Sequence, residues 1–210
     1  AGTKVSTGLC NIMIGQNAGY CETTGGNNVY IGGYAGRCST TSSENIAIGN
    51  FAGRDLVSGC NLFIGIKAGM CVGGAASHNI GIGYLAGGGD NGSSTDGTGD
   101  YNVSLGYAAG QSITTAGYNI FIGQQAGLYY KTGSNNTALG TGALYGSSTA
   151  ANNTGTYNLA MGYNAGYSNT SGDYNVFLGW KAGNTNTSGD HSIAIGYDVE
   201  LPSATTNCQL

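Results

Sequence analysis

Charged side chains are scarce in this chain, and that scarcity excludes several classes of function. Only 8 % of the 210 residues are charged, and the six Lys and Arg are spread along a chain whose formal net charge is −4. Without a basic patch the chain has no electrostatic footprint for nucleic acid. Apolar residues never run on for the roughly 18 positions that a membrane-spanning helix needs, so we expect no membrane insertion.

Proline occurs once and histidine twice, whereas glycine contributes 41 residues. Glycine does not recur at every third residue, which excludes collagen, and apolar residues recur at fixed intervals, which argues against disorder. His78 and His191 each stand directly before a copy of the repeat described next, so they occupy equivalent places instead of converging on one site. No nucleophile motif, acid–base pair or phosphate loop can be placed, and the sequence therefore predicts neither an enzyme nor a cofactor site.

One nine-residue phrase recurs eleven times and organises the chain. Its clearest copy is NVYIGGYAG, at residues 28–36. The copies begin at residues 11, 28, 45, 61, 79, 102, 119, 136, 158, 175 and 192, and most intervals are 17 residues. A fixed period of this size indicates a stack of structural repeats, which makes residues 1–210 a single repeat domain.

Each repeat reads as a strand, a corner and a loop when its first residue is numbered position 0. Positions 1 and 3 are almost always Ile, Val, Leu or Met, and residues two apart lie on one side of an extended strand. Position 4 is Gly in every copy, position 7 is Ala in the first ten and position 8 is Gly in nine, which indicates a tight corner. Positions 10 to 16 have turn-forming residues. The predicted fold is an all-β parallel β-solenoid or β-roll with about 11 rungs of 17 residues.

Both faces of the predicted strand carry apolar residues, so either could be buried in the core. Positions 1 and 3 are the expected core, and the Asn at position 0 is expected to form a ladder of stacked amides. Position 2 is also partly apolar, since it holds Met13, Tyr30, Phe63, Phe121 and Phe177. Either that second face meets a partner surface, or the coil is flattened and its own loop covers the face.

The two longest intervals lengthen the loop that follows the corner, at residues 87–100 and 145–157. Length variation confined to one side of a repeat stack is typical of a binding face. The first long loop contains Asp90, Asp96 and Asp100, whose oxygens are ligands of the kind that calcium prefers. Solvated turn aspartates are the simpler interpretation, so we expect no metal site.

Aromatic residues form two rows. Position 5 carries Tyr84, Tyr107, Tyr163, Trp180 and Tyr197, and the position before each repeat, position −1, carries Tyr101, Tyr118, Tyr157 and Tyr174. These rows are either stacking ladders that stiffen the rod or a strip that binds glycans or another subunit. Candidate glycosylation acceptors are Asn91, Asn135, Asn152, Asn169 and Asn186, whereas the sequon at Asn102 begins a strand and is expected in the ladder.

Six cysteines in so polar a chain suggest an oxidising, extracellular setting. If the polar loop is a tight hairpin, positions 10 and −1 meet at its base, which predicts the disulfides Cys10–Cys21 and Cys60–Cys71. Cys38 and Cys208 have no partner under this rule and are candidates for bridges between chains. Residues 1–2 match positions 7 and 8, and residues 209–210 match positions 0 and 1, so we expect open rungs that invite end-to-end association with other copies.

The repeat resembles those of phage and phage-like tail-fibre proteins. NTALGTGALY at residues 136–145 is especially similar to the NTAIGxxAL form of that family, and the repeats are more distantly similar to the β-roll heads of trimeric autotransporter adhesins. The resemblance covers nearly the whole chain and implies an extracellular, often homotrimeric fibre that attaches to surfaces. We therefore expect a non-enzymatic structural protein that forms an extracellular fibre or filament with copies of itself. The alternative is an adhesin that binds a receptor or cell-surface glycans.

Overall fold

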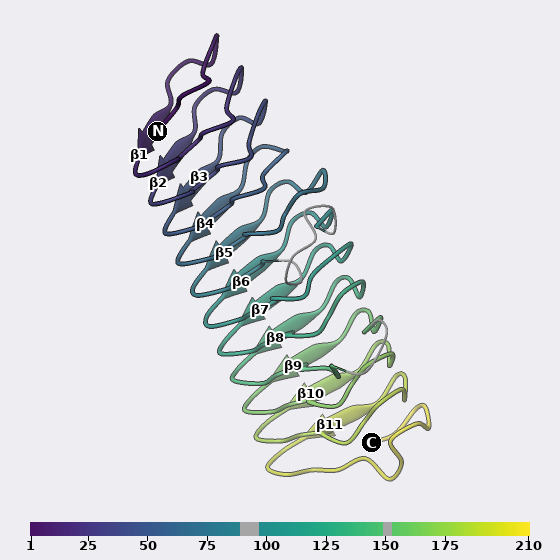
Figure 1. The fold of residues 1–210 in the computed structure, drawn as a ribbon. Helices are drawn as coiled ribbons and strands as arrows, with labels where there is room; N and C mark the ends of the chain where they lie inside the picture. The colour runs from purple at the N-terminus through teal and green to yellow at the C-terminus, as the bar shows by residue number, and fades with distance from the viewer. Residues whose placement is uncertain (89–96, 149–152) are drawn as a thin grey trace.

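The structure is a computed structural model that describes residues 1–88, 97–148 and 153–210. It is an elongated stack of coils with eleven short strands that follow one another along one side (Figure 1). The strands are β1 (Ile12–Ile14), β2 (Val29–Ile31), β3 (Ile46–Ile48), β4 (Leu62–Ile64), β5 (Ile80–Ile82), β6 (Val103–Leu105), β7 (Ile120–Ile122), β8 (Thr137–Leu139), β9 (Leu159–Met161), β10 (Val176–Leu178) and β11 (Ile193–Ile195). Each strand is positions 1 to 3 of one repeat, as the spacing predicts.

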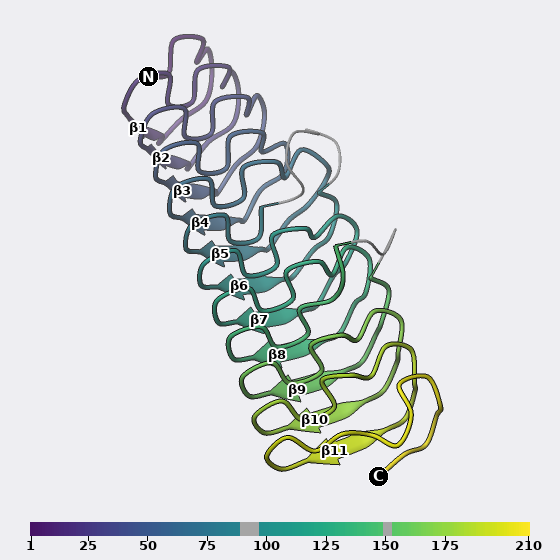
Figure 2. The same cartoon turned by 60° about the horizontal axis from the view of Figure 1, so that its bottom comes forward.

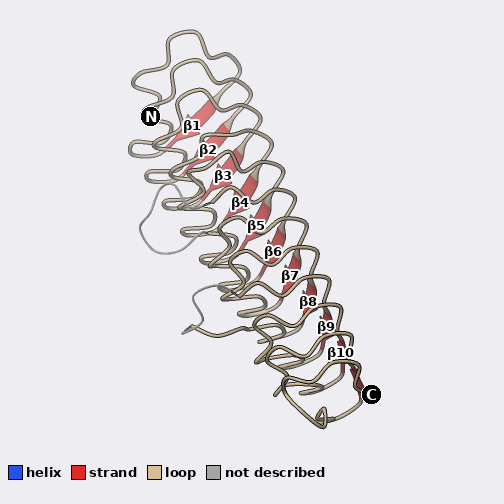
Figure 3. Ribbon diagram, turned by 90° about the vertical axis from the view of Figure 1, so that its right-hand side faces the viewer, coloured by secondary structure: helices blue, strands red, loops and turns tan. Residues whose placement is uncertain are grey.

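The strands form one parallel sheet in chain order, and like positions pair with like. Ile12 pairs with Val29, and Ile14 with Ile31. After each strand the chain turns through the corner and returns along the opposite side of the rod to begin the next rung (Figures 2 and 3). The predicted all-β parallel solenoid is therefore confirmed. The described part of the chain has no helix that could cross a membrane.

The corner after each strand depends on a residue without a side chain. Gly49, at position 4 of its repeat, has φ +135, and a Cβ there would lie 2.4 Å from the carbonyl oxygen of Gly65 one rung away. Positions 6 and −1 are also left-handed, although most of their residues are not glycine; Tyr34 has φ 60 and Glu44 has φ 62. The stack therefore imposes this conformation on side chains that disfavour it elsewhere.

The core lies behind position 2, which corrects the expectation that positions 1 and 3 are buried. Tyr30, Phe63 and Phe121 are fully buried, whereas no residue at position 1 or 3 is buried. The coil is flattened, and its own return segment covers the position 2 face with small side chains from position 7 and larger ones from position 11, such as Leu56 and Tyr130. Of the two alternatives, coverage by the chain's own loop is the one observed.

The asparagines at position 0 form the predicted ladder. Asn119 is fully buried. Its Nδ2 donates to Asn102 Oδ1 at 3.0 Å and to the Gly133 carbonyl at 3.0 Å. Its own Oδ1 accepts from the backbone N–H and the side-chain amide of Asn136 at 2.9 and 3.2 Å. Each rung thus ties the strand to its loop and to the next rung without leaving these buried amide groups unpaired.

Buried apolar side chains divide into two clusters among the described residues. One runs from Ala18 to Ala76 and the other from Ala109 to Leu201. Between them, position 2 is occupied by Gly81 in β5 and Ser104 in β6, so these two strands contribute no large side chain to the core. The apolar core is therefore interrupted near the middle of the rod.

Candidate functional site

The outward face of the sheet is an apolar surface, which we call the sheet face and define as positions 1 and 3 of β1 to β11. Of these 22 residues, 21 are Ile, Val, Leu or Met, the exception being Thr137. None is charged and none is buried; Ile82 is 39 % exposed and Ile120 is 42 % exposed. An exposed apolar surface of this length is uncommon on monomeric proteins, which makes the sheet face a candidate contact surface.

Aromatic side chains stack along the rod at the positions that the sequence predicts. At position 5, Tyr84 stacks on Tyr107, and Trp180 lies between Tyr163 and Tyr197, with ring centroids 6.1 and 4.6 Å away. The rings lie almost parallel to one another, and Trp180 is covered on both faces, whereas Tyr197 has one ring neighbour in the column and is 75 % exposed.

The row at position −1 forms two further columns. Tyr101 stacks between His78 and Tyr118, and Tyr174 stacks between Tyr157 and His191, with ring centroids 4.8 to 5.0 Å apart. Both histidines are therefore members of stacks at equivalent places. The stacking ladder is the arrangement observed, and contact with glycans stays a prediction.

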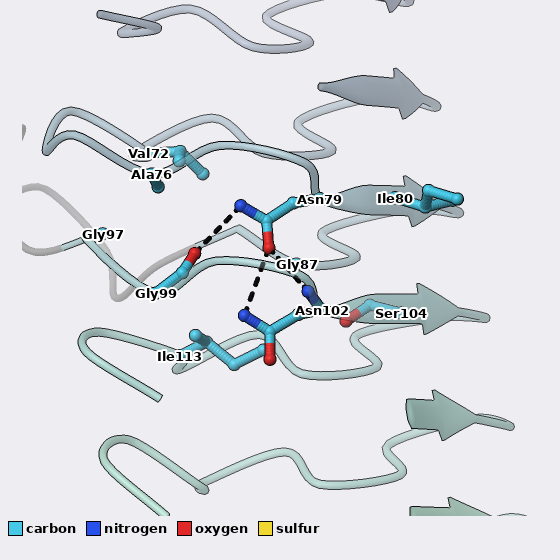
Figure 4. A pocket seen from close by; sticks show the side chains of 10 residues that line it. All are labelled: Val72, Ala76, Asn79, Ile80, Gly87, Gly97, Gly99, Asn102, Ser104 and Ile113. Carbon is cyan, nitrogen blue, oxygen red and sulfur yellow. Dashed lines mark hydrogen bonds between the residues drawn. The ribbon is translucent and has the colours of Figure 1, made fainter. Parts of the chain in front are cut away.

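A small cavity lies inside the coil between β5 and β6 (Figure 4). In the figure the amides of Asn79 and Asn102 lie one above the other and point the same way, and Asn79 Oδ1 accepts from the backbone N–H and the side-chain amide of Asn102. The space exists because Gly81 and Ser104 carry little side chain, and Ser104 Oγ is buried without a hydrogen-bond partner. With a free volume of about 10 Å³, the cavity is only as large as one water molecule and cannot admit a substrate.

The acidic residues that raised the question of calcium hold loops together where they are described. Asp100 Oδ1 accepts from the backbone N–H of Ser77 at 2.6 Å. Asp173 also stands two residues before a repeat, and its Oδ1 accepts from the backbone N–H of Thr156 at 2.6 Å. Among the described residues no group of three His, Cys, Asp or Glu could hold a metal ion. Asp90 and Asp96 lie outside the described residues.

Cysteine pairing does not follow the sequence prediction. All six cysteines are free, so the structure contains neither Cys10–Cys21 nor Cys60–Cys71. The prediction assumed a tight hairpin, but position 11 points into the core, so the loop forms a second wall of the coil. Like positions therefore stack on like: the N–H of Cys21 donates to the carbonyl of Arg37, which sets Cys21 beside Cys38 on the next rung.

The two cysteines proposed for bridges between chains differ in their surroundings. Cys208 is exposed, whereas Cys38 is partly buried. Burial, and then the carboxylate of Asp55, raise the pKa of the Cys38 thiol. Because the thiolate is the reactive form, Cys38 is a poor nucleophile at neutral pH, and Cys208 is the better placed of the two.

Glycan acceptors are fewer than the sequons suggest. Asn169 and Asn186 occupy position 11 and are fully buried, and Asn169 Nδ2 donates to the hydroxyl of Tyr130 at 3.1 Å. Neither side chain has room for a glycan, which corrects the prediction for these two. Asn135 is exposed and stays a candidate, and Asn91 and Asn152 lie outside the described residues. Position 11 is apolar in some repeats and polar in others, so its burial has no clear signal in the sequence.

Comparison of this chain with protein-family models, with curated proteins and with solved structures finds no match.

Proposed function

We propose that this chain is a non-enzymatic structural rod of an extracellular fibre, and that the fibre forms by association of copies of the chain with one another. The observation that supports the proposal is the in-register stacking of like residues from β1 to β11. In such a stack every neighbouring pair of rungs makes the same kinds of contact, so length can increase without new types of interaction.

Two kinds of column give the rod its stiffness. The buried Asn ladder links each rung to the next through side-chain and backbone hydrogen bonds, as between Asn102 and Asn119. Stacked rings such as Trp180 on Tyr197 run along the same axis on the surface. Both favour a structural role, and the resemblance to tail-fibre repeats points the same way. The extracellular location rests on that resemblance and on the cysteine content.

Electron microscopy and fibre diffraction of the purified chain test the proposal. We expect unbranched filaments and, from aligned samples, a reflection at about 4.8 Å along the filament axis, which is the spacing of hydrogen-bonded strands. Particles that stay the length of a single chain at every concentration would contradict a fibre.

An adhesin is the second candidate, and the exposure of the position 5 column favours it. Tyr107 is 50 % exposed and Tyr163 is 47 % exposed, so ring edges are available to a glycan. A glycan array separates the two functions. Specific binding that is lost when Tyr163, Trp180 and Tyr197 are changed to Ala would favour the adhesin, and an array without specific binding would favour the structural rod.

A further inference from the structure

We propose that two copies of this chain pair side by side through their sheet faces, as a dimer in which the two parallel sheets pack against each other. The pairing deepens the proposed self-association and rests on it, but it uses the side of the rod and not its ends. It would cover the sheet face, whose apolar side chains no other described segment of the chain buries.

The chemistry of the sheet face matches a second copy of itself. Only Thr137 interrupts the two aliphatic columns, and the face carries no charge, so two copies meet without electrostatic repulsion and without desolvating an ion. Ile14 is 59 % exposed, Ile82 is 39 % exposed and Ile195 is 62 % exposed, so exposed apolar side chains are found at both ends and in the middle of the sheet face.

The dimensions of the sheet face are those of a specific interface. Ten steps of about 4.8 Å give a length of roughly 50 Å, and two columns of side chains about 7 Å apart give a width of roughly 12 Å. Each copy would therefore bury roughly 600 Å², or about 1,200 Å² in total, which reaches the lower end of the range for stable protein pairs. The whole face must take part to reach that area, which requires rods that lie alongside each other over their full length.

The regular spacing of the strands makes the sheet face complementary to itself. Both columns repeat at the strand spacing, so a two-fold axis in the interface sets rows of side chains from one copy between rows of the other. One flat face covers another of equal size completely, with the sheets about 10 Å apart. Three copies around a central axis would leave the two columns of each face splayed apart and partly wet, so the inference commits to two copies.

Sedimentation equilibrium of the whole chain tests the pairing. The test variant carries Ile80→Lys, Ile82→Lys and Ile120→Lys, which place charges on exposed positions of the sheet face. The matched control carries Thr41→Lys, Thr115→Lys and Ser171→Lys, which place the same charges at exposed loop positions. At concentrations below those at which filaments form, we expect a dimer for the unchanged chain and for the control, and dimerisation at least 100-fold weaker for the test variant.

Folding and contact site are checked separately. Circular dichroism must show the test variant folded; if it is not, the single change Ile120→Lys replaces it, with dimerisation at least tenfold weaker expected. In addition, a photoreactive benzoylphenylalanine at the position of Ile82 should cross-link to a strand peptide of the other copy. Cross-links to loop peptides alone would overturn the proposal.

The width and the length of rods in electron micrographs distinguish side-by-side pairing from end-to-end fibre formation. Rods of double width support the pairing. Long rods of single width, made by end-to-end association, would overturn the pairing and leave the fibre standing. A trimer mass, a dimer that persists in the test variant, or a monomer whose sheet face instead binds an apolar dye would each overturn it as well.

Discussion

Single residues at the corners decide whether the rungs can approach one another. At position 4 the backbone of one rung lies against the carbonyl of the next, as Gly49 does against Gly65, and φ is positive there. The close approach and the positive φ together exclude a side chain, which explains why glycine occupies this position in every repeat. At positions 6 and −1 only the second condition holds, so Tyr, Lys and Cys are found there as well.

Gly49→Val should destabilise the chain by about 2–3 kcal/mol, because the new side chain meets backbone one rung away in a left-handed conformation that a β-branched residue disfavours. The measurement is chemical denaturation followed by circular dichroism. Asn50→Ile is the matched control, since its neighbour at position 5 on the next rung is already Ile66, and we expect a change within about 0.5 kcal/mol. Equal denaturation midpoints for the two variants would show that the corner at Gly49 has room for a side chain.

The buried carboxyl of Glu22 should lower the free energy of unfolding as pH rises. Burial raises the pKa of this carboxyl, and the hydrogen bond from the N–H of Gly25 to Oε1 opposes the rise only in part. The folded state therefore holds the proton more tightly than the unfolded state does. The contribution is favourable below the unfolded pKa of about 4.3, and it is lost as pH increases toward the raised value.

Glu22→Gln removes this titration and keeps an oxygen for the N–H of Gly25. The variant should match the unchanged chain near pH 3 and be the more stable of the two at pH 7, in denaturation experiments across that range. A difference between the two chains that does not vary with pH would refute the role of this carboxyl.

The rung, the element that repeats, is held by columns that run through the stack. Inside it the Asn ladder joins strand to loop, and outside it the aromatic columns join corner to corner. Because like positions stack in register, a change at one place in a rung is felt by the same place in the two neighbouring rungs.

Asn119→Ala should cost about 3 kcal/mol or more, because it leaves the N–H of Asn136, the Gly133 carbonyl and the Asn102 Oδ1 short of buried partners. Thermal and denaturant melts measure the loss. Asn135→Gly is the control one residue before the next ladder Asn: it is exposed, and its φ of 60 suits glycine, so we expect a change of a few tenths of a kcal/mol. A ladder variant as stable as this control would mean that the amides are dispensable.

Register also predicts which disulfide can form. Cys21 and Cys38 lie side by side on neighbouring rungs, with Cα atoms about 4.8 Å apart, a distance that a disulfide can span. Treatment with glutathione disulfide, which is reduced as the two thiols are oxidised, should therefore yield Cys21–Cys38 in peptide mass spectra. Recovery of Cys10–Cys21 or Cys60–Cys71 instead would restore the hairpin model of the loop.

The sequence predicted the architecture and the ladders, because a 17-residue period and an invariant glycine have few physical interpretations. It did not predict which face of the strand is buried. Positions 1 and 3 are more consistently apolar than position 2, and the more apolar face is normally the buried one. One signal was present: alternate residues share a side, so a buried Asn at position 0 requires position 2 to be inside as well.

The narrow interior explains why the aliphatic pairs lie outside. A Cβ at Gly36 would lie 2.7 Å from the ring of Tyr30, so a rung has room for one large side chain from the strand and not for two. The left-handed residues at positions 6 and −1 had no sequence signal, since Glu44, Tyr101 and Cys60 share no chemical property. Contacts between rungs impose their conformation.

As a whole molecule, the chain is a rod in which each strand pairs only with the strands of the neighbouring rungs, while Tyr130 also reaches Asn169 two rungs away. Its described surface offers one long apolar face, formed by positions 1 and 3 of β1 to β11. The two apolar clusters are joined, between β5 and β6, by strand pairing and by the Asn79–Asn102 hydrogen bonds.

That interruption gives the rod a mechanical property. A beam under sideways load yields where its cross-section resists least, and at Gly81 and Ser104 the strands contribute no large side chain that opposes compression or shear between the rungs. Curvature of a loaded rod should therefore concentrate near the middle of each chain and recur at a fixed interval along any filament. A fibre built this way would flex like a chain of stiff segments linked by compliant joints, and would absorb a transverse force without parting.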